Sequence, residues 1–261
     1  MISNKLSNRR TSCASTSLRG FVEVLESRTL LSVTAYEGFN YPRGTVLNGK
    51  SGGTGWATKW IEYLYSENKS YDVIASGSLG FGKLLHTGNR LVTTGEYDFV
   101  DRTSSNEGGV PGTTTYVSYL IRQEGKGDGA GFNLPDYGGV ELDDSAGNSV
   151  FVGKPQDWNF SDFGIENLAN SAQASSTVKA QFMQTYLIVA GISWGAGGND
   201  TISLYVDPAN LGGAAPPKAS AVMKVQLNQL ADVGISAGTD ATWGFDELRV
   251  GTSFADVTPV F

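Results

Sequence analysis

The sequence contains little charge, one cysteine and one histidine, and these shortages exclude several classes of protein. Charged residues make up 17% of the 261 residues, whereas soluble proteins average about 25%, so long charged helix faces are not expected. Cys13 lies close to the N-terminus, so the rest of the chain can form neither a disulfide nor a thiolate metal site. His86 is the only histidine, which excludes any mechanism that needs two, and its surroundings predict a partly exposed strand residue.

The chain also lacks a long apolar run. The longest, residues 186–192 (YLIVAGI), falls far short of the roughly 20 residues that a membrane-spanning helix needs. Residues 1–20 are rich in Ser, Thr, Arg and Asn, and they contain no continuous apolar stretch. The sequence therefore predicts no transmembrane segment and no conventional signal peptide.

Charge divides the chain into a basic head and an acidic body. Residues 1–32 carry five basic and two acidic side chains, a net charge of +3. Because the whole chain has a net charge of −7, residues 33–261 carry −10. An acidic body repels phosphate backbones, so nucleic acid is not expected as a partner.

The body has the pattern of a β protein, with frequent glycines between short segments of period two. Residues 201–207 (TISLYVD) alternate apolar and polar side chains, as a half-buried strand requires. Residues 116–123 and 186–194 are apolar on both faces, which is typical of central strands. Residues 139–143 and 149–152 flank the turn-forming DSAGN, which predicts a hairpin.

Helix is predicted to be scarce. Residues 168–184 have the composition of a loop with at most a short helical turn, because Ser and Thr cluster there. Residues 227–232 are a second weak helical candidate, and residues 245–251 are predicted to form a late strand. No internal repeat and no Ser/Pro tract divides residues 33–261, so they are expected to form one sandwich or barrel.

A short motif ends the head of the chain. Residues 25–32 (LESRTLLS), preceded by Glu23, resemble the LEPR-XLL motif, an N-terminal signature of exported proteins in planctomycete-type bacteria. Val22 and Ser27 stand where that motif usually has Phe and Pro. The resemblance implies that the protein is exported, to the extracellular space or the cell surface, and it implies no biochemical activity.

The body resembles the LamG-like domains of such exported proteins. Residues 36–60 (YEGFNYPRGTVLNGKSGGTGWATKW) are similar to the opening of those domains, and residues 150–155, 198–208 and 245–259 are similar to later blocks. The resemblance implies an all-β, concanavalin A-like (LamG-like) jelly-roll β-sandwich of two antiparallel sheets over residues 33–261. It would follow a disordered or short-helical head, residues 1–32. The same fold holds lectins, adhesion modules, glucanases and spacers, so it does not settle function.

The sequence lacks the carboxylate pattern of a glucanase. Retaining glucanases of this fold carry E-x-D-x-E on one strand, where alternation places the carboxylates on one face. Glu141 and Asp143 would share a face here, but Ser145 stands at the position of the second glutamate. We therefore predict that the protein is not an enzyme, with a glucanase-type glycoside hydrolase as the alternative.

Aromatic residues are the candidates for ligand binding, because the faces of sugar rings stack on aromatic rings. Trp194 and Tyr205 lie near the ends of predicted strands, and Trp158 lies in a predicted loop. These three are the candidate sugar-binding residues, with a role in the core as the alternative for each. Trp56 and Trp60 belong to the opening block of the resemblance, so we expect them to be structural and to share a face.

Carboxylates at strand and loop ends are candidate ligands for Ca²⁺, which prefers oxygen atoms. Asp200 and Asp207 bracket one predicted strand, and Asp246 and Glu247 lie on the late strand. No run has the spacing of a recognised Ca²⁺ loop, so solvated turn residues are the alternative. A Ca²⁺ cofactor is predicted only through these four residues.

These observations favour a non-catalytic extracellular or cell-surface module that binds carbohydrate or a surface protein. The alternative is a structural, matrix-type domain with no small ligand. The binding module requires a concave face with at least two exposed aromatic residues beside carboxylates or amides. The structural domain requires a face that is bare or filled by aliphatic side chains.

Overall fold

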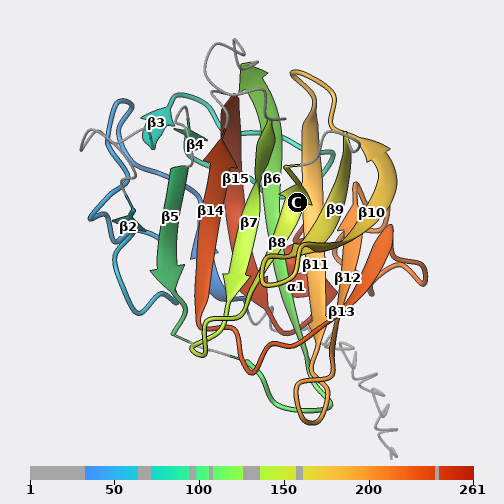
Figure 1. Cartoon of the computed structure of the whole chain (residues 1–261). Helices are drawn as coiled ribbons and strands as arrows, with labels where there is room; N and C mark the ends of the chain where they lie inside the picture. The colour runs from blue at the N-terminus through green and yellow to red at the C-terminus, as the bar shows by residue number, and fades with distance from the viewer. Residues whose placement is uncertain are drawn as a thin grey trace, which may run out of the picture. The chain divides into compact units, whose positions relative to one another are not determined.

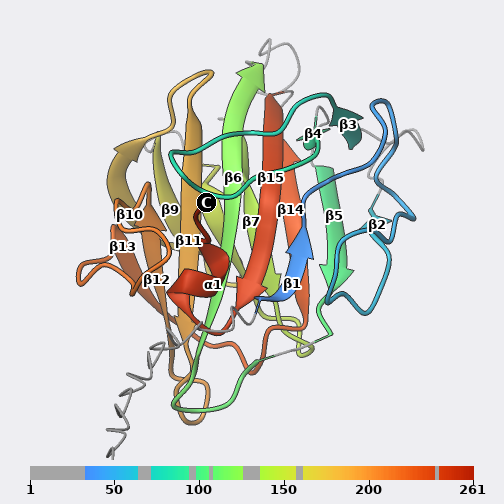
Figure 2. The same ribbon diagram turned by 180° about the vertical axis from the view of Figure 1, so that it is seen from behind.

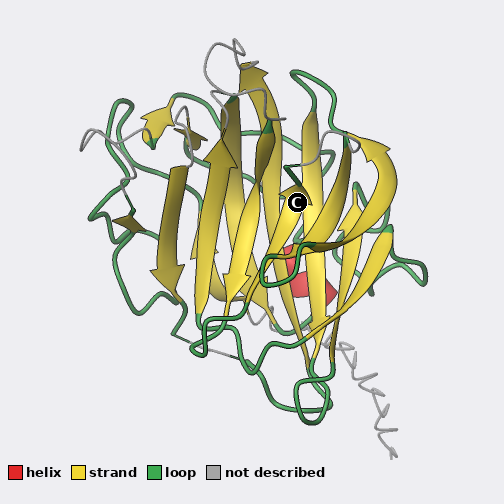
Figure 3. Ribbon diagram, in the orientation of Figure 1, coloured by secondary structure: helices red, strands yellow, loops and turns green. Residues whose placement is uncertain are grey.

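The computed structural model describes residues 33–63, 72–93, 98–105, 108–125, 136–156, 161–238 and 241–261 (Figure 1). The head, residues 1–32, lies outside the described residues, and so do the predictions made for it. Within the described ranges the chain forms fifteen strands and one short helix, as the glycine-rich period-two pattern predicts (Figure 3). No helix in these ranges has the length and apolar character needed to span a membrane.

The strands form two antiparallel sheets. The first has eight strands, in the order β13 (Ala221–Val225), β12 (Asp200–Val206), β11 (Thr185–Ser193), β6 (Thr114–Gly125), β15 (Thr242–Gly251), β4 (Arg90–Thr93) and β3 (Val73–Ala75), with β1 (Val33–Glu37) beside β15. The second has seven, in the order β10 (Ala172–Lys179), β9 (Asp162–Asn167), β8 (Ser149–Lys154), β7 (Tyr137–Asp143), β14 (Asp232–Gly238), β5 (Asp98–Thr103) and β2 (Ile61–Glu62). One apolar core lies between them. The Tyr119 hydroxyl on β6 donates a hydrogen bond across this core to the Val152 carbonyl on β8, at 2.5 Å. The predicted two-sheet sandwich is confirmed.

Two segments differ from the prediction. Residues 172–179 form strand β10 rather than a loop or helical turn. Their backbone pairs with β9 in antiparallel orientation, with Ala174 opposite Ile165. Pairing with a neighbouring strand outweighs a local Ser/Thr composition, since strand preference depends strongly on context. Residues 227–231 are irregular and lead into β14, with Leu227 and Leu230 buried in the core.

The outer face of the eight-stranded sheet is covered. Residues 76–89, called the covering segment here, and the helix α1 (Phe254–Val257) lie across β6, β11 and β15 (Figure 2). They close a second apolar cluster whose buried members are Leu79, Leu84, Leu120, Leu187, Val189, Phe254 and Val257. This sheet therefore buries side chains on both faces. His86, expected in a strand, lies exposed in the covering segment.

The opening block of the sequence builds a buried ion pair. Arg102 Nη1 donates to Glu37 Oε2 at 2.9 Å, and both side chains are at most 2% exposed. Trp60 Nε1 donates to the same oxygen at 3.1 Å, and the Arg102 guanidinium lies over the Trp56 and Trp60 rings. The centroids of the two indole rings lie 6.2 Å apart. Trp60 is buried in the core and Trp56 packs against it, which confirms their predicted structural role. Tyr41 also contacts this carboxylate, because its hydroxyl donates to Glu37 Oε2 at 2.9 Å.

Removing one member of this pair should destabilise the fold strongly. Arg102→Ala leaves the Glu37 carboxylate buried without its cation, which costs about 3–5 kcal/mol in comparable pairs. Urea unfolding followed by tryptophan fluorescence measures the loss. The control is Arg43→Ala, at an exposed position, which should change the free energy of unfolding by about 0.5 kcal/mol at most. A loss below about 1 kcal/mol for Arg102→Ala would contradict this role.

Candidate functional site

The outer face of the seven-stranded sheet, called the open face here, differs from the covered face of the other sheet. The one helix among the described residues packs on β6 and β15, so it does not cover this face. The outward positions of β5, β14, β7, β8 and β9 are aromatic, acidic, serine, threonine or glycine rather than aliphatic. The open face is therefore the surface on which a candidate site can be built.

Strand pairing sets acidic side chains in a row across the open face. Asp101 of β5 lies opposite Gly234 of β14, and Gly234 lies opposite Glu141 of β7. Glu141 in turn lies opposite Phe151 of β8, which lies opposite Glu166 of β9. Side chains in such a row point to one side of the sheet and lie close enough to interact.

A second row lies beside the first. Asp143 of β7 lies opposite Asp232 of β14 on one side and Ser149 of β8 on the other. Because residues i and i+2 of a strand share a face, Asp143 stands next to Glu141. Their shared face was predicted from the sequence, and the structure confirms it. Asp232 supplies a further carboxylate from a neighbouring strand.

Aromatic rings lie against glycines on the same face. Gly234 lies beneath Phe99 and Gly238 beneath Tyr137, where an added Cβ would come within 2.3 Å of a ring atom. The absence of a side chain thus lets each ring lie against the sheet. Tyr63, half exposed at 51%, continues this surface, because its ring centroid lies 5.5 Å from that of Phe99.

A cavity of about 190 Å³ opens between the aromatic and acidic side chains. It is smaller than the roughly 300–1,000 Å³ typical of sites for drug-sized ligands, so it suits one small ring. The residues that line it come from four strands of the open face and from the connections after β8 and β9: Tyr137, Glu141, Phe151, Gln156, Glu166, Leu168 and Ser236.

Three carboxyl groups of the open face have raised pKa values. Burial and the charges of Asp143, Asp101 and Glu166 together raise the pKa of Glu141 to about 7. Burial and the charge of Asp232 raise the pKa values of Asp101 and Asp143 to about 6. Among the described residues, the charges that shift these three pKa values most are negative. Perturbed carboxyl groups beside a cavity are typical of functional sites.

The predicted sugar-binding residues lie elsewhere. Trp194 is 4% exposed, and its Nε1 donates to Thr115 Oγ1 at 2.9 Å, so its ring belongs to the core. Tyr205 lies on the covered face of the eight-stranded sheet, edge-on to Phe254 at 5.6 Å between ring centroids. Trp158 lies outside the described residues. The structure does not bring Trp194 and Tyr205 together on the open face.

Two of the predicted Ca²⁺ ligands hold the covering segment. Asp246, fully buried, accepts hydrogen bonds from Ser78 Oγ at 2.6 Å and from the Leu79 N–H at 2.7 Å. Burial raises its pKa to about 8. Glu247, 1% exposed, accepts from the Thr87 N–H at 2.6 Å. Both carboxylates therefore have a structural task on the covered sheet.

The other two predicted Ca²⁺ ligands fix turns at opposite ends of β12. Asp200 accepts from the N–H groups of Gly195 and Leu227, at 2.8 and 2.9 Å. Asp207 accepts from the Leu187 N–H at 2.8 Å. Across the described ranges, no three His, Cys, Asp or Glu side chains gather in a geometry suited to a metal ion. The four residues do not form a shared ligand set, and Ca²⁺ dependence stays a prediction.

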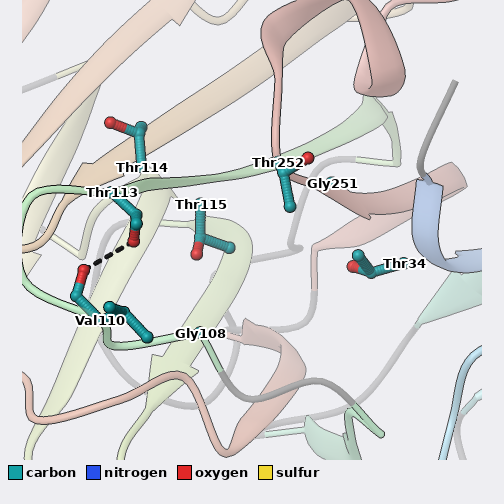
Figure 4. Close-up of a pocket in the computed structure, with 8 residues that line it drawn as sticks. All are labelled: Thr34, Gly108, Val110, Thr113, Thr114, Thr115, Gly251 and Thr252. Carbon is teal, nitrogen blue, oxygen red and sulfur yellow. Dashed lines mark hydrogen bonds between the residues drawn. The ribbon is translucent and has the colours of Figure 1, made fainter. Parts of the chain in front are cut away.

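A larger cavity, of about 460 Å³, lies where β1, β6 and β15 meet (Figure 4). Its lining is mostly threonine, with Thr34, Gly108, Val110, Thr113, Thr114, Thr115, Gly251 and Thr252. Several hydroxyls are already engaged, since Thr113 Oγ1 donates to the Val110 carbonyl at 2.6 Å. The described part of its lining contains no titratable side chain and no aromatic ring, so it offers less chemistry than the described residues of the open face.

Sequence reasoning missed most of the open-face residues. Tyr63, Phe99 and Tyr137 lie in three strands or strand ends far apart in the chain, and only strand order brings them together. The signal that could have found them is a glycine at the outward position of a neighbouring strand, such as Gly234 or Gly238.

The raised pKa values predict how stability changes with pH. A carboxyl group with a higher pKa in the folded chain binds protons preferentially there, so its contribution to stability falls as pH rises. For Glu141 the fall spans the window from its ordinary value of 4.5 to about 7. Glu141→Gln should therefore reduce the drop in Tm between pH 5 and pH 8.

We expect a reduction of at least about 2 °C, which corresponds to about 1 kcal/mol for a domain of this size. Differential scanning calorimetry of the two proteins at both pH values measures it. Asp162→Asn, at a carboxylate of the same sheet outside the two rows, should keep the wild-type profile. Parallel profiles for wild type and Glu141→Gln would refute the assignment.

No protein-family model and no curated protein sequence matches the chain. Among solved structures, the T. cruzi calreticulin globular domain is 12% identical, with a TM-score of 0.52, over 87% of this chain and 91% of that one. An endo-beta-1,4-glucuronan lyase from Trichoderma reesei gives 13% identity and a TM-score of 0.49 over 87% and 99%. The Emp46p carbohydrate recognition domain gives 11% and 0.43 over 74% and 88%. At 12% identity, the likeness to the calreticulin domain shows the fold alone, a concanavalin A-like β-sandwich.

Proposed function

We propose that the protein is a non-catalytic, exported module that binds carbohydrate across the open face. The observation that carries the proposal is the set of aromatic rings lying on glycines, beside carboxyl groups whose pKa values are raised by burial and by neighbouring acids. Ring faces supply stacking surface for sugar rings. Carboxylate oxygens accept hydrogen bonds from sugar hydroxyls. The open face thus combines both kinds of contact on one rigid sheet.

The spacing of the aromatic residues favours a ligand longer than one sugar. The rings of Phe99 and Tyr137 lie over Gly234 and Gly238, which are four residues apart on β14. Four residues of a strand span about 13 Å. Ser236 lies between the two glycines and lines the small cavity, as does Glu141, which lies opposite Gly234. A chain of sugars could therefore stack on the rings at each side and bind the polar groups in the middle.

The charge of the open face favours neutral glycans over uronic acid polymers. Residues 33–261 carry a net charge of −10, and the described charges that most affect Asp101, Glu141 and Asp143 are negative. A carboxylate on each sugar would meet like charge at short range, which costs free energy. Neutral hydroxyls meet no such repulsion.

Loss of the Tyr63 or Tyr137 ring should weaken glycan binding. A glycan array identifies the neutral ligand, and isothermal titration calorimetry then compares wild type with Tyr63→Ala and Tyr137→Ala. Each variant should bind about 2- to 12-fold more weakly, since an aromatic contact contributes about 0.5–1.5 kcal/mol. Phe182→Ala removes an aromatic side chain that is 48% exposed in the loop between β10 and β11, and it should bind like wild type.

Three other outcomes would each redirect the proposal. No binding to any neutral glycan would favour the structural, matrix-type domain. Preference for uronic acid polymers would contradict the charge argument. Loss of binding in EDTA would support the predicted Ca²⁺ dependence and would call for a ligand set other than Asp200, Asp207, Asp246 and Glu247.

A second candidate function, acid–base cleavage of a glycan, rests on one observation. Glu141 has a pKa of about 7 while the neighbouring Asp143 and Asp101 have pKa values of about 6. Carboxyl groups with separated pKa values can divide the roles of acid and base. The binding module predicts no release of reducing ends from a glycan that binds. If the wild type releases reducing ends from a bound glycan, and Glu141→Gln binds the glycan without releasing them, the protein is an enzyme instead.

A further inference from the structure

We infer a second carbohydrate subsite in an amide-lined cavity at one end of the sandwich. The cavity has a volume of about 360 Å³, and its lining comes from the β7–β8 turn, the end of β9, the β9–β10 turn, the β11–β12 turn and the end of β13. The polar side chains that the inference uses are Asn148, Asn167, Asn170, Asn199, Gln226 and Lys224. None of them belongs to the open-face cavity.

Two amide groups present N–H donors to this cavity. Asn167 Oδ1 accepts from the Ala169 N–H at 3.0 Å, and Asn170 Oδ1 accepts from the Ala172 N–H at 3.0 Å. A backbone N–H needs an acceptor, so it fixes which amide atom is the oxygen. The Nδ2 groups of both asparagines are therefore held as donors for a ligand.

Two other amide groups present acceptors. Asn148 Nδ2 donates to Asp144 Oδ2 at 2.7 Å, and Asn199 Nδ2 donates to the Ala196 carbonyl at 3.1 Å. Because only nitrogen can donate, the Oδ1 atoms of these two residues are left to accept. The cavity thus presents fixed donors and fixed acceptors around one space.

This alternation suits hydroxyl groups, since each hydroxyl can both donate and accept. The described lining contains no Asp or Glu, and Lys224 is its one charged side chain. A neutral sugar with several hydroxyls fits this donor set better than a multiply charged anion or a metal ion does. Amide side chains fixed by the backbone also lose little freedom when a ligand binds.

One short segment separates the two cavities. Glu166 and Leu168 line the open-face cavity, whereas Asn167, Ala169 and Asn170 line the amide cavity. Glu166 and Asn167 are consecutive residues of β9, so their side chains point to opposite sides of the sheet. The inference rests on the proposed function in one respect, because it extends the ligand from the open face to a polysaccharide that reaches both cavities.

The test compares short and long neutral ligands. Cello-, manno- and xylo-oligosaccharides of two and six sugars are titrated against the full chain by calorimetry. Asn167→Asp combined with Asn170→Asp keeps the oxygens that accept from Ala169 and Ala172 but replaces the two donors. We expect about tenfold weaker binding of the six-sugar ligand or more, and unchanged binding of the two-sugar ligand.

Asn40→Asp combined with Asn210→Asp is the matched control, because it adds the same two negative charges at exposed asparagines outside both cavities. It should leave both affinities unchanged. Equal affinity of wild type and the double variant for the six-sugar ligand would overturn the second subsite while the open-face site stands. No binding of any of these ligands to wild type would overturn both.

Discussion

The buried carboxylates of β15 determine which face of the sandwich meets the solvent. Asp246 and Glu247 accept hydrogen bonds from the covering segment, which then lies over an apolar cluster on the eight-stranded sheet. A carboxylate in a low-dielectric interior needs such partners, and a backbone N–H supplies them without mobile side chains. The covered sheet is consequently structural on both faces, and ligand chemistry is left to the open face and the ends of the strands.

Burial of acidic groups has two different results in this protein. The Glu37 carboxylate accepts hydrogen bonds from Arg102, Trp60 and Tyr41, and it lies at the centre of a buried hydrogen-bond network. The Glu141 carboxyl group is hydrogen-bonded to Ser236, and burial and neighbouring acids raise its pKa to about 7. The pKa of Asp246 is also raised, to about 8, but its hydrogen bonds hold the covering segment. Glu141 differs from both structural acids because it lines a cavity.

The sequence was sufficient for the class of fold and insufficient for the site. Period two and glycine spacing predict a β-sandwich or barrel, and the LamG-like resemblance implies the two-sheet sandwich. The shared face of Glu141 and Asp143 follows from strand alternation, which is a local property. The neighbours of a strand depend on topology, so Asp232 and Asp101 could not be placed beside β7. Trp194 was a candidate because it is aromatic near a strand end, yet an acceptor on the adjacent strand holds it in the core.

Hydrogen–deuterium exchange with and without a bound neutral oligosaccharide tests the central claim most directly. Ligand contacts slow the exchange of the amides that they shield, and they map the surface without any substitution. We predict slower exchange in peptides that contain residues 137–143 and 232–238, with peptides from β6 and β11 unchanged. Slower exchange confined to the eight-stranded sheet, or to the threonine-lined cavity around residues 108–115, would contradict the assignment of binding to the open face.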